Sequence, residues 1–225
     1  PSYFHQHVGG YSSVKLARYR DLIEHHLSKG NMNVFNMLNT KYFITGKPGQ
    51  EIAQQNPNAN GSVWFVNEID WAKNADEEMG KMRDFDSKNT VIIDERFKEY
   101  VNGVTPNNSP QNTINLSSFH PDKMVYSTNS STENFAVFSE IWYKGNVDWK
   151  AYIEGKEAEF VRVNYLLRGM KIPAGQHEIT FEFHPTSHYV GSKISLVASV
   201  LIIAMVLGLL AMVVMKKELP GMKED

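Results

Sequence analysis

The stretch Ile194–Met215, ISLVASVLIIAMVLGLLAMVVM, contains no charged residue and decides how the rest of the chain is interpreted. As a helix, its 22 residues would be about 33 Å long, enough to cross the hydrocarbon core of a bilayer. A buried helix of a soluble protein rarely runs this long without a polar face. We therefore predict a transmembrane helix, and its place near the carboxyl end excludes a signal peptide.

The residues on either side of this helix predict its orientation. Lys216 and Lys217 follow it directly and Lys223 stands close behind, whereas the ten residues before it contain a single lysine and no arginine. Positive charge favours the cytoplasmic side, so we expect residues 216–225 to form a cytoplasmic tail and residues 1–190 to be extracytoplasmic. The sequence begins with Pro1, and no secretory signal precedes the polar region. We therefore expect a carboxy-terminal piece of a longer membrane protein.

The composition outside this helix is that of a polar, folded protein. The 225 residues have a mean hydropathy of -0.38, with 23 basic and 25 acidic side chains. A formal net charge of -2 argues against nucleic acid as a partner. There is no cysteine, which excludes thiol nucleophiles, iron–sulfur clusters and cysteine zinc sites.

The first half of the chain mixes helical and strand patterns. Residues 1–45 are expected to form a membrane-proximal helical segment, with a helix from Ser12 or Ser13 to about Ser28 that Gly30 ends. Residues 46–112 are expected to form a mixed α/β region, which opens with a polar loop (46–62) and closes with a linker (102–112). The other elements expected are a short helix within residues 31–45, strands at Lys41–Thr45, Ser62–Ile69 and Thr90–Asp94, and helices at Asn74–Phe85 and Glu95–Val101.

The second half reads as consecutive short strands with turn residues between them. The expected strands are Asn115–Phe119, Lys123–Thr128, Asn134–Lys144, Trp149–Glu154, Glu157–Asn164, Leu166–Ile172 and His177–Phe183. Glu154, Gly155 and Lys156 form a tight hairpin turn in this interpretation. Strands at this spacing predict an antiparallel β-sandwich over residues 113–190, followed by the transmembrane helix at 191–215. The fold class is α+β.

Two blocks of the sequence are similar to one family of bacterial membrane proteins. The first is SYFHQHVGGY…KLARYRDLIEHH with NMLNTKYFI, and the second is ENFAVFSEIWYKG…WKAYIEGKE…RVNYLLRGMKIPAGQHEITFEFHP. With the closing apolar helix, they resemble the carboxy-terminal part of the YfhO-like family. The stretches NPNANGSVWFV and TVIIDERF are similar to members from Bacteroides and its relatives.

The resemblance implies a multi-spanning protein of the bacterial inner membrane that is similar to GT-C glycosyltransferases. Such enzymes transfer a sugar from a polyprenyl-phosphate donor to an acceptor outside the cytoplasmic membrane, here a cell-envelope glycan. Their usual catalytic carboxylate lies in the first extracytoplasmic loop, which this sequence does not contain. The resemblance therefore assigns no catalytic residue and no cofactor to this part, and it implies the lipid bilayer and upstream transmembrane helices as partners.

The basic face of the first helix is the leading candidate for contact with a lipid phosphate. Arginine offers a two-pronged set of donors to phosphate oxygens, and Lys15 and Arg18 lie about one turn apart. Gly9 and Gly10 would let backbone amides approach the same group. The full candidate set is Lys15, Arg18, Tyr19, His25, His26 and Lys29 with Gly9 and Gly10. An ordinary solvated face is the alternative.

Two further sets of residues have weaker claims. The candidate rings for stacking on sugars are Trp142, Tyr143, Trp149 and Tyr152, although alternation along a strand would bury about half of them. His5 and His7 would point the same way in a strand, but no carboxylate stands at a metal-ligand spacing nearby, so we predict no metal site.

Two hypotheses for function follow. In the first, the chain is the accessory end of a GT-C-like glycosyltransferase, where it helps seat the donor or contacts the acceptor. In the second, a single membrane anchor displays a non-catalytic β-sandwich that binds a glycan or a protein.

Overall fold

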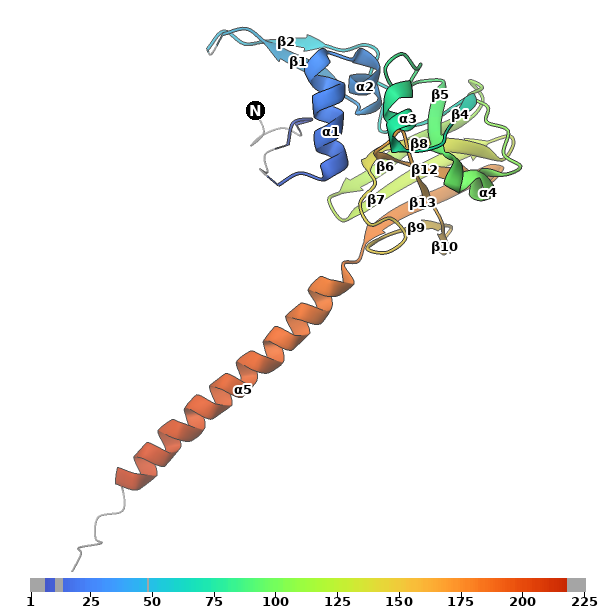
Figure 1. The fold of residues 1–225 in the computed structure, drawn as a ribbon. Helices are drawn as coiled ribbons and strands as arrows, with labels where there is room; N and C mark the ends of the chain where they lie inside the picture. Colours follow the sequence, from blue (N-terminus) through green and yellow to red (C-terminus); the bar gives the residue numbers. More distant parts are fainter. Residues whose placement is uncertain (1–6, 11–13, 48, 218–225) are drawn as a thin grey trace, which may run out of the picture. The chain divides into compact units, whose positions relative to one another are not determined.

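The computed structural model describes residues 7–10, 14–47 and 49–217 and divides the chain into two compact units (Figure 1). The first unit is Pro1–His184, which holds the two large sheets and a layer of short helices. The second unit is Pro185–Asp225, and its described part is the long helix α5 (Thr186–Lys217).

Two sheets form the frame of the first unit. The six-stranded sheet has the order β3-β8-β12-β11-β5-β4. Its strands are β3 (Val63–Phe65), β4 (Glu68–Ala72), β5 (Thr90–Asp94), β8 (Asn134–Ile141), β11 (Val161–Val163) and β12 (Leu167–Ile172). The five-stranded sheet has the order β10-β9-β13-β7-β6. Its strands are β6 (Thr113–His120), β7 (Lys123–Ser130), β9 (Trp149–Ile153), β10 (Lys156–Ala158) and β13 (Gly175–Phe183).

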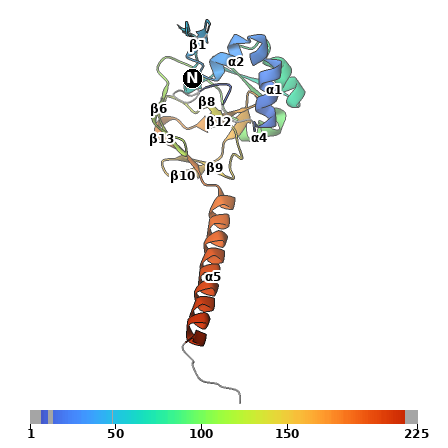
Figure 2. The ribbon, with the colours of Figure 1, turned by 90° about the vertical axis from the view of Figure 1, so that its left-hand side faces the viewer.

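The two sheets pack face to face, as the sandwich prediction requires. Along β8, Ala136 and Phe138 join a buried cluster between the sheets, while Phe135 and Val137 join a second cluster on the opposite face. This alternation follows from the period of two along a strand. The first cluster is rich in aromatic rings, and Phe138 and Phe181 meet edge to face at 4.9 Å. Figure 2 shows the helices on one side of the sheets.

A layer of short helices covers the outer face of the six-stranded sheet. These helices are α1 (Ala17–His25), η1 (Leu27–Lys29), α2 (Met32–Met37), α3 (Ala75–Lys81), η2 (Glu95–Phe97) and α4 (Lys98–Val101). Leu22, Val34 and Met37 are fully buried against the sheet. Asn74 caps α3 by accepting a hydrogen bond from the Glu77 backbone N–H, which satisfies one of the otherwise unpaired donors of that helix.

The first helix is shorter than predicted. It begins at Ala17, and the described residues 14–16 before it are not helical; Ser12 and Ser13 lie outside the described residues. The predicted stop is confirmed, because Gly30 adopts a left-handed conformation with φ 72° at the end of η1.

Three strand predictions were wrong in detail. The polar loop contains β2 (Ile52–Gln55), which pairs with β1 (Tyr42–Thr45) in a separate two-stranded sheet. Ser62–Ile69 is interrupted, because β3 pairs with β8 whereas β4 pairs with β5. Glu157–Asn164 divides into β10 and β11, which belong to different sheets. Pairing between residues far apart in the sequence decides where each of these strands begins and ends and which sheet it joins. The local sequence pattern does not reveal such pairing.

The sandwich is also not purely antiparallel, and it does not begin at residue 113. The β4–β5 pair is parallel, and β3, β4 and β5 come from the mixed region before residue 113. Only two residues separate β3 and β4, which stand at opposite ends of the sheet order. Two residues span at most about 11 Å, whereas a flat sheet of this size would be about 24 Å wide. The six-stranded sheet must therefore curl until these edges approach each other.

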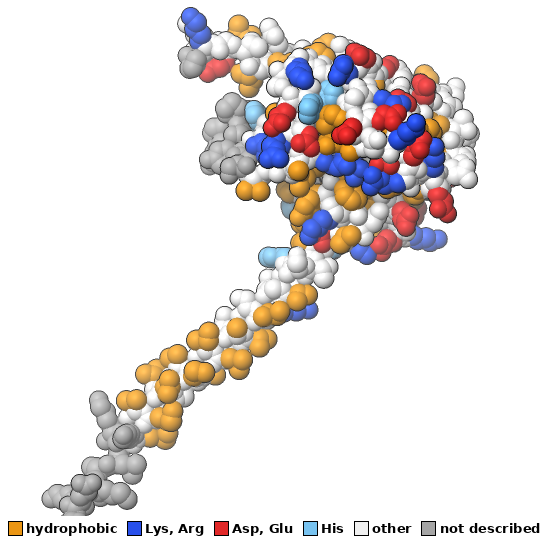
Figure 3. All heavy atoms as spheres, viewed as in Figure 1, with side chains coloured by type: hydrophobic (Ala, Val, Ile, Leu, Met, Phe, Trp, Pro, Cys, Tyr) orange, Lys and Arg blue, Asp and Glu red, His pale blue; other side chains and the backbone are white. Residues whose placement is uncertain are grey.

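The second unit carries the predicted membrane helix. Among the described residues, Thr186–Met215 is the one helix that is long and apolar enough to cross a membrane, with a mean hydropathy of 3.0 in its most apolar window. None of that window is buried in the structure, and Figure 3 shows hydrophobic side chains along its length. A helix of 32 residues is about 48 Å long, slightly more than a whole bilayer with its headgroups.

Candidate functional site

The basic face predicted for the first helix is divided by the fold. Arg18, Tyr19 and His26 face the protein, whereas His25 and Lys29 are exposed, as is Lys15 ahead of the helix. The His26 ring lies 3.0 Å from the Met79 carbonyl oxygen and also contacts the Asn31 side chain. Burial lowers the pKa of His26, and the contacts of its ring are with α3 and with the cap of α2, not with a site open to solvent.

Arg18 is the residue of this face that enters a charged cluster. Its Nη1 donates a hydrogen bond to the Tyr165 carbonyl oxygen at 3.2 Å, and its guanidinium stacks 4.3 Å from the centre of the Tyr165 ring. The same Nη1 lies 3.7 Å from Oε2 of Glu78, which is fully buried. Arg18 therefore links α1 to α3 and to the segment after β11.

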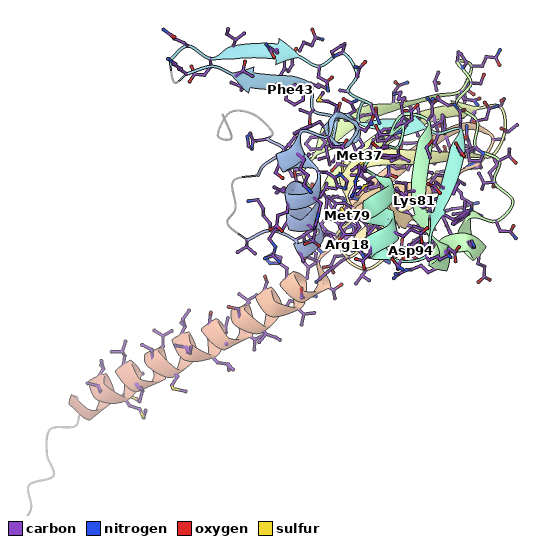
Figure 4. The ribbon with its side chains drawn as sticks, turned by 45° about the horizontal axis from the view of Figure 1, so that its top comes forward. Arg18, Met37, Phe43, Met79, Lys81 and Asp94 are labelled. Carbon is purple, nitrogen blue, oxygen red and sulfur yellow. The ribbon has the colours of Figure 1, made fainter. Side chains whose placement is uncertain are left out.

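We define the arginine cluster as Arg18, Arg96 and Arg162 with the carboxylates of Glu78 and Asp94. Arg162 Nη2 lies 3.9 Å from Glu78 Oε2, and Arg96 Nη2 lies 2.6 Å from Asp94 Oδ2. Figure 4 shows Arg18 and Asp94 at the same end of the helical layer. The guanidinium side chains become steadily less exposed, from 57% for Arg96 to 29% for Arg18 and 10% for Arg162.

A tight backbone turn after β11 positions this cluster. Asn164 and Tyr165 have φ values of 46° and 66°, an unusual conformation for residues with side chains. The turn is held because Glu78 Oε1 accepts the Tyr165 backbone N–H at 2.7 Å and Asn164 Oδ1 accepts the Ile92 N–H at 2.8 Å. The Tyr165 hydroxyl donates to Asp21 at 2.9 Å, which ties the turn to α1.

Burial and neighbouring charges both shift the pKa values of the cluster, and burial dominates for Glu78 and Arg162. Burial raises the pKa of Glu78, against the opposing effects of the Tyr165 N–H and of the arginines. The hydrogen bond from Arg96 lowers the pKa of Asp94. Burial lowers the pKa of Arg162, and the nearby Arg18 charge adds to that effect.

Hydrogen-bonding capacity is left over at the buried end of the cluster. Nε and Nη2 of Arg162 are buried without a hydrogen-bond acceptor, and Oε2 of Glu78 is buried without a donor. A buried N–H without an acceptor costs about 1–3 kcal/mol, so a polar oxygen that reaches Arg162 would relieve that cost. The chemistry that this arrangement supports is binding of an anionic or polar oxygen, with charge supplied by Arg18 and Arg96.

The glycine pair is not joined to a helix. Gly10 has φ 64° and its N–H donates to the His7 carbonyl oxygen at 3.0 Å, which forms a turn. The first helix begins only at Ala17, so the described backbone does not place this turn at a helix N-terminus. Among the described residues, no three histidine or carboxylate side chains gather as a metal site would require; His5 lies outside them.

The four aromatic candidates do not share one surface. Trp149 is buried in the sandwich under Arg168, whose guanidinium carbon lies 4.1 Å from the centre of its ring. Trp142 and Tyr152 are half-buried, and Trp142 packs against the sandwich core. Tyr143 alone is exposed, at 38%. Alternation along β9 accounts for the buried Trp149 and the half-buried Tyr152, whereas Trp142 and Tyr143 lie in the loop after β8.

The most buried members of the arginine cluster were not among the predicted site residues. Glu78 is the third of three consecutive acidic residues in the first turn of α3, and Arg162 stands in a short stretch, FVRV, between apolar residues. A charged residue in the middle of such an apolar strand was the sequence signal that could have pointed to a buried ion pair. Its partners come from α1, α3 and β5, and no local pattern connects these elements.

Comparison with known proteins identifies the family. A family profile described as bacterial membrane protein YfhO matches residues 80–195, which is 116 of the 225 residues. This segment runs from the end of α3 to the first turns of α5 and includes the five-stranded sheet and all of the six-stranded sheet except β3 and β4. No curated protein and no solved structure matches the chain. The match covers more than half of the sequence, and it agrees with an apolar helix of membrane-spanning length, so the chain belongs to the YfhO family of bacterial membrane proteins.

Proposed function

We propose that this chain is the extracytoplasmic carboxy-terminal portion of a multi-spanning inner-membrane glycosyltransferase of the GT-C type. The enzyme would transfer a sugar from a polyprenyl-phosphate donor to a cell-envelope glycan. The observation that carries the proposal is the uncovered apolar surface of α5, joined to a folded unit in a chain of a bacterial membrane protein family. A lipid-linked donor requires an enzyme held at the membrane.

The lysines around α5 support the orientation. Lys216 and Lys217 end the helix and Lys223 follows, whereas Lys193 is the single lysine or arginine among the ten residues before the apolar stretch. The positive-inside rule then directs residues 216–225 to the cytoplasm and the two sheets to the outer side. Envelope glycans are extended on that side, so the folded unit would meet both donor and acceptor.

The arginine cluster is the part of this chain best suited to contact the donor. Arg96 and Arg18 present partly exposed charge, and Arg162 behind them has two N–H groups that lack acceptors. A phosphate oxygen would satisfy those donors through charge-assisted hydrogen bonds. These residues would position the donor; the chemical step would belong to the upstream part of the protein.

The test is sugar transfer by the full-length protein in native membranes, with a polyprenyl-phosphate sugar as donor. Arg162→Lys keeps the charge but loses the two-pronged donor geometry, so we expect a higher KM for the donor in a folded protein. Lys156→Ala, in the β9–β10 turn, is the matched control because its side chain is exposed outside the cluster. Unchanged donor KM in Arg162→Lys and in Arg18→Ala would remove the donor-contact role.

The orientation has its own test, in which a single cysteine is introduced into residues 1–225, which contain none, on a background free of other cysteines. Lys223→Cys and Lys156→Cys are labelled in intact spheroplasts with a membrane-impermeant maleimide. We expect Lys156→Cys to react and Lys223→Cys to react only after the membrane is opened. The reverse pattern would reject the extracytoplasmic placement. Correct orientation with no transfer activity in the full-length protein would instead favour a non-catalytic, membrane-anchored binding module.

A further inference from the structure

One end of the sandwich surrounds the point where the chain leaves the first unit. The Phe183 N–H donates to the Asp122 carbonyl oxygen at 2.8 Å, and the His184 N–H donates to the Asp148 carbonyl oxygen at 2.6 Å. The β6–β7 turn and the β8–β9 loop therefore flank the last residues of β13. The helix α5 begins at Thr186, two residues later.

Exposed apolar side chains gather at this end. Phe119 is 46% exposed at the end of β6, and Tyr143 and Val147 in the β8–β9 loop are 38% and 63% exposed. Within residues 53–184, all of which the structure describes, no other large apolar side chain is this exposed. The centre of the Tyr143 ring lies 6.5 Å from that of Phe183, the last residue of β13 before the chain runs on to α5. We call Phe119, Tyr143 and Val147 the apolar rim.

The length of the connection keeps the apolar rim near the bilayer whatever the orientation of the two units. Thr186–Lys193 precede the apolar stretch that begins at Ile194, and eight helical residues span about 12 Å. The headgroup region itself is about 5–8 Å thick on each side of the hydrocarbon core. The two steps from Thr186 to His184 add at most about 7 Å, so His184 lies within about 14 Å of the headgroups, and tilting α5 would only shorten that separation.

The charges around the apolar rim are paired with one another. Lys123 Nζ lies 2.7 Å from Glu182 Oε1, and Lys144 Nζ lies 2.9 Å from Asp148 Oδ2. Such pairing leaves little net charge to attract a charged partner. This end of the sandwich is therefore apolar and aromatic, and the charged side chains around it form ion pairs. Such a surface suits the boundary between headgroups and acyl chains, where tyrosine is enriched.

We propose that the apolar rim is a second membrane contact of this protein, in which Phe119, Tyr143 and Val147 enter the headgroup region of the bilayer beside α5. The contact would hold the folded unit against the membrane surface and limit its rotation about the two-residue link to α5. It depends on α5 crossing the membrane, but not on which side the sheets occupy, so it stands or falls separately from the proposed function.

The test measures the depth of a spin label in the full-length protein, reconstituted in vesicles of phosphatidylethanolamine and phosphatidylglycerol. A nitroxide is attached at Val147→Cys, and the control is Lys156→Cys, in the turn at the opposite end of β9. Collision rates with oxygen, which concentrates in lipid, and with a water-soluble nickel complex give the depth. We expect the oxygen-to-nickel ratio to be several-fold higher at Val147→Cys than at Lys156→Cys.

Two other results would overturn the proposal. Equal, water-like ratios at both positions would show that the apolar rim is in water. Low collision rates with both reagents at Val147→Cys would show that protein covers it. Adding Phe119→Ser to Val147→Cys provides a further check, because loss of a neighbouring anchor should lower the ratio; Phe119 is largely exposed, so the fold should tolerate the change.

Discussion

Arg162 and Arg168 face each other across the β11–β12 pair and each lies over a tryptophan ring, yet the charges around them differ. Arg162 reaches the arginine cluster, where Glu78 and Asp94 supply negative charge. Arg168 lies in the sandwich among aromatic rings, with ring centres at 4.1 Å for Trp149 and 5.2 Å for Phe181. Like charges directly opposite in a sheet are unfavourable, so each arginine needs its own compensation.

The comparison separates two ways of burying a charge. Arg168 is 2% exposed and donates one hydrogen bond, from Nε to the Ile141 carbonyl oxygen at 3.2 Å. Burial lowers the pKa of Arg168 to about 10, so it remains charged at neutral pH, and the rings and the nearby Glu140 offset the loss of water. Arg162 keeps unused N–H groups beside more exposed arginines. Nη1 of Arg168 is also buried without an acceptor, so the two sites differ mainly in their neighbours: aromatic rings around Arg168, and partly exposed arginines with two carboxylates around Arg162.

The largest expected effect comes from breaking the aromatic arrangement. Arg168→Ala removes the long side chain from a packed core and should lower the free energy of unfolding by about 3–5 kcal/mol. Arg168→Met, which keeps the apolar contacts, should lose less than half as much. Denaturant unfolding in detergent, followed by tryptophan fluorescence, would measure both. Equal losses would mean that charge, and not packing on the rings, stabilises this site.

An intermediate effect is expected in the arginine cluster from Glu78→Gln. Glutamine can still accept the Tyr165 N–H and lacks the charge whose burial outweighs its attraction to Arg18 and Arg162, so the free energy of unfolding at neutral pH should rise by about 1–2 kcal/mol. The neighbouring Glu77→Gln is the matched control, because Glu77 forms a partly exposed pair with Lys81 and accepts the Lys73 N–H, which glutamine can also accept, so stability should change by under about 1 kcal/mol.

Glu78→Gln should also change the pH dependence of stability. The pKa of Glu78 is raised above its ordinary 4.5 by burial, so the folded state binds its proton more tightly than the unfolded state does. Its contribution is then fully present below pH 4.5 and is lost as the pH rises through the folded-state pKa. In Glu78→Gln, the free energy of unfolding should no longer decline over this pH range, as unfolding curves measured at several pH values would show. A decline of the same size in both proteins would show that another group causes it.

The smallest effect is expected for Asp94→Asn. Asparagine still caps η2 through the Arg96 N–H, while the ion pair with the 57% exposed Arg96 side chain is worth only about 0.5–1 kcal/mol. The pKa of Asp94 is lowered from 3.8, so its contribution is present above that value and disappears as the pH falls through the folded-state pKa. Wild type and variant should therefore converge in acid. A difference that persists there would assign the effect to packing.

Much of the secondary structure was predictable because its causes are local. Alternation placed Ile179 and Phe181 of β13 in the core, and the left-handed Gly30 ended the first helical segment. Glu154 and Gly155 both have positive φ, as the predicted hairpin requires. The hairpin strand β2 was missed, because Ile52–Gln55 is exposed along its whole length and shows no buried face.

The candidate site was predictable only in part, for a physical reason. Arg18 was identified from the charge pattern of its helix, but the same pattern also selected His26, which is buried and held by Asn31 and Met79. Helical periodicity reports which residues share a face. It does not report which part of that face another element will cover, and Glu78 covers the Arg18 end.

By itself, the sequence determined the membrane helix and the sandwich, because hydropathy over a long window and strand alternation are properties of neighbouring residues. Only the tertiary structure decided that β3 and β4 stand at opposite ends of one curled sheet and that Glu78, Asp94 and three arginines meet. Such meetings depend on pairings between residues as distant as Arg18 and Tyr165, and the energies that select them arise only when the whole core is packed.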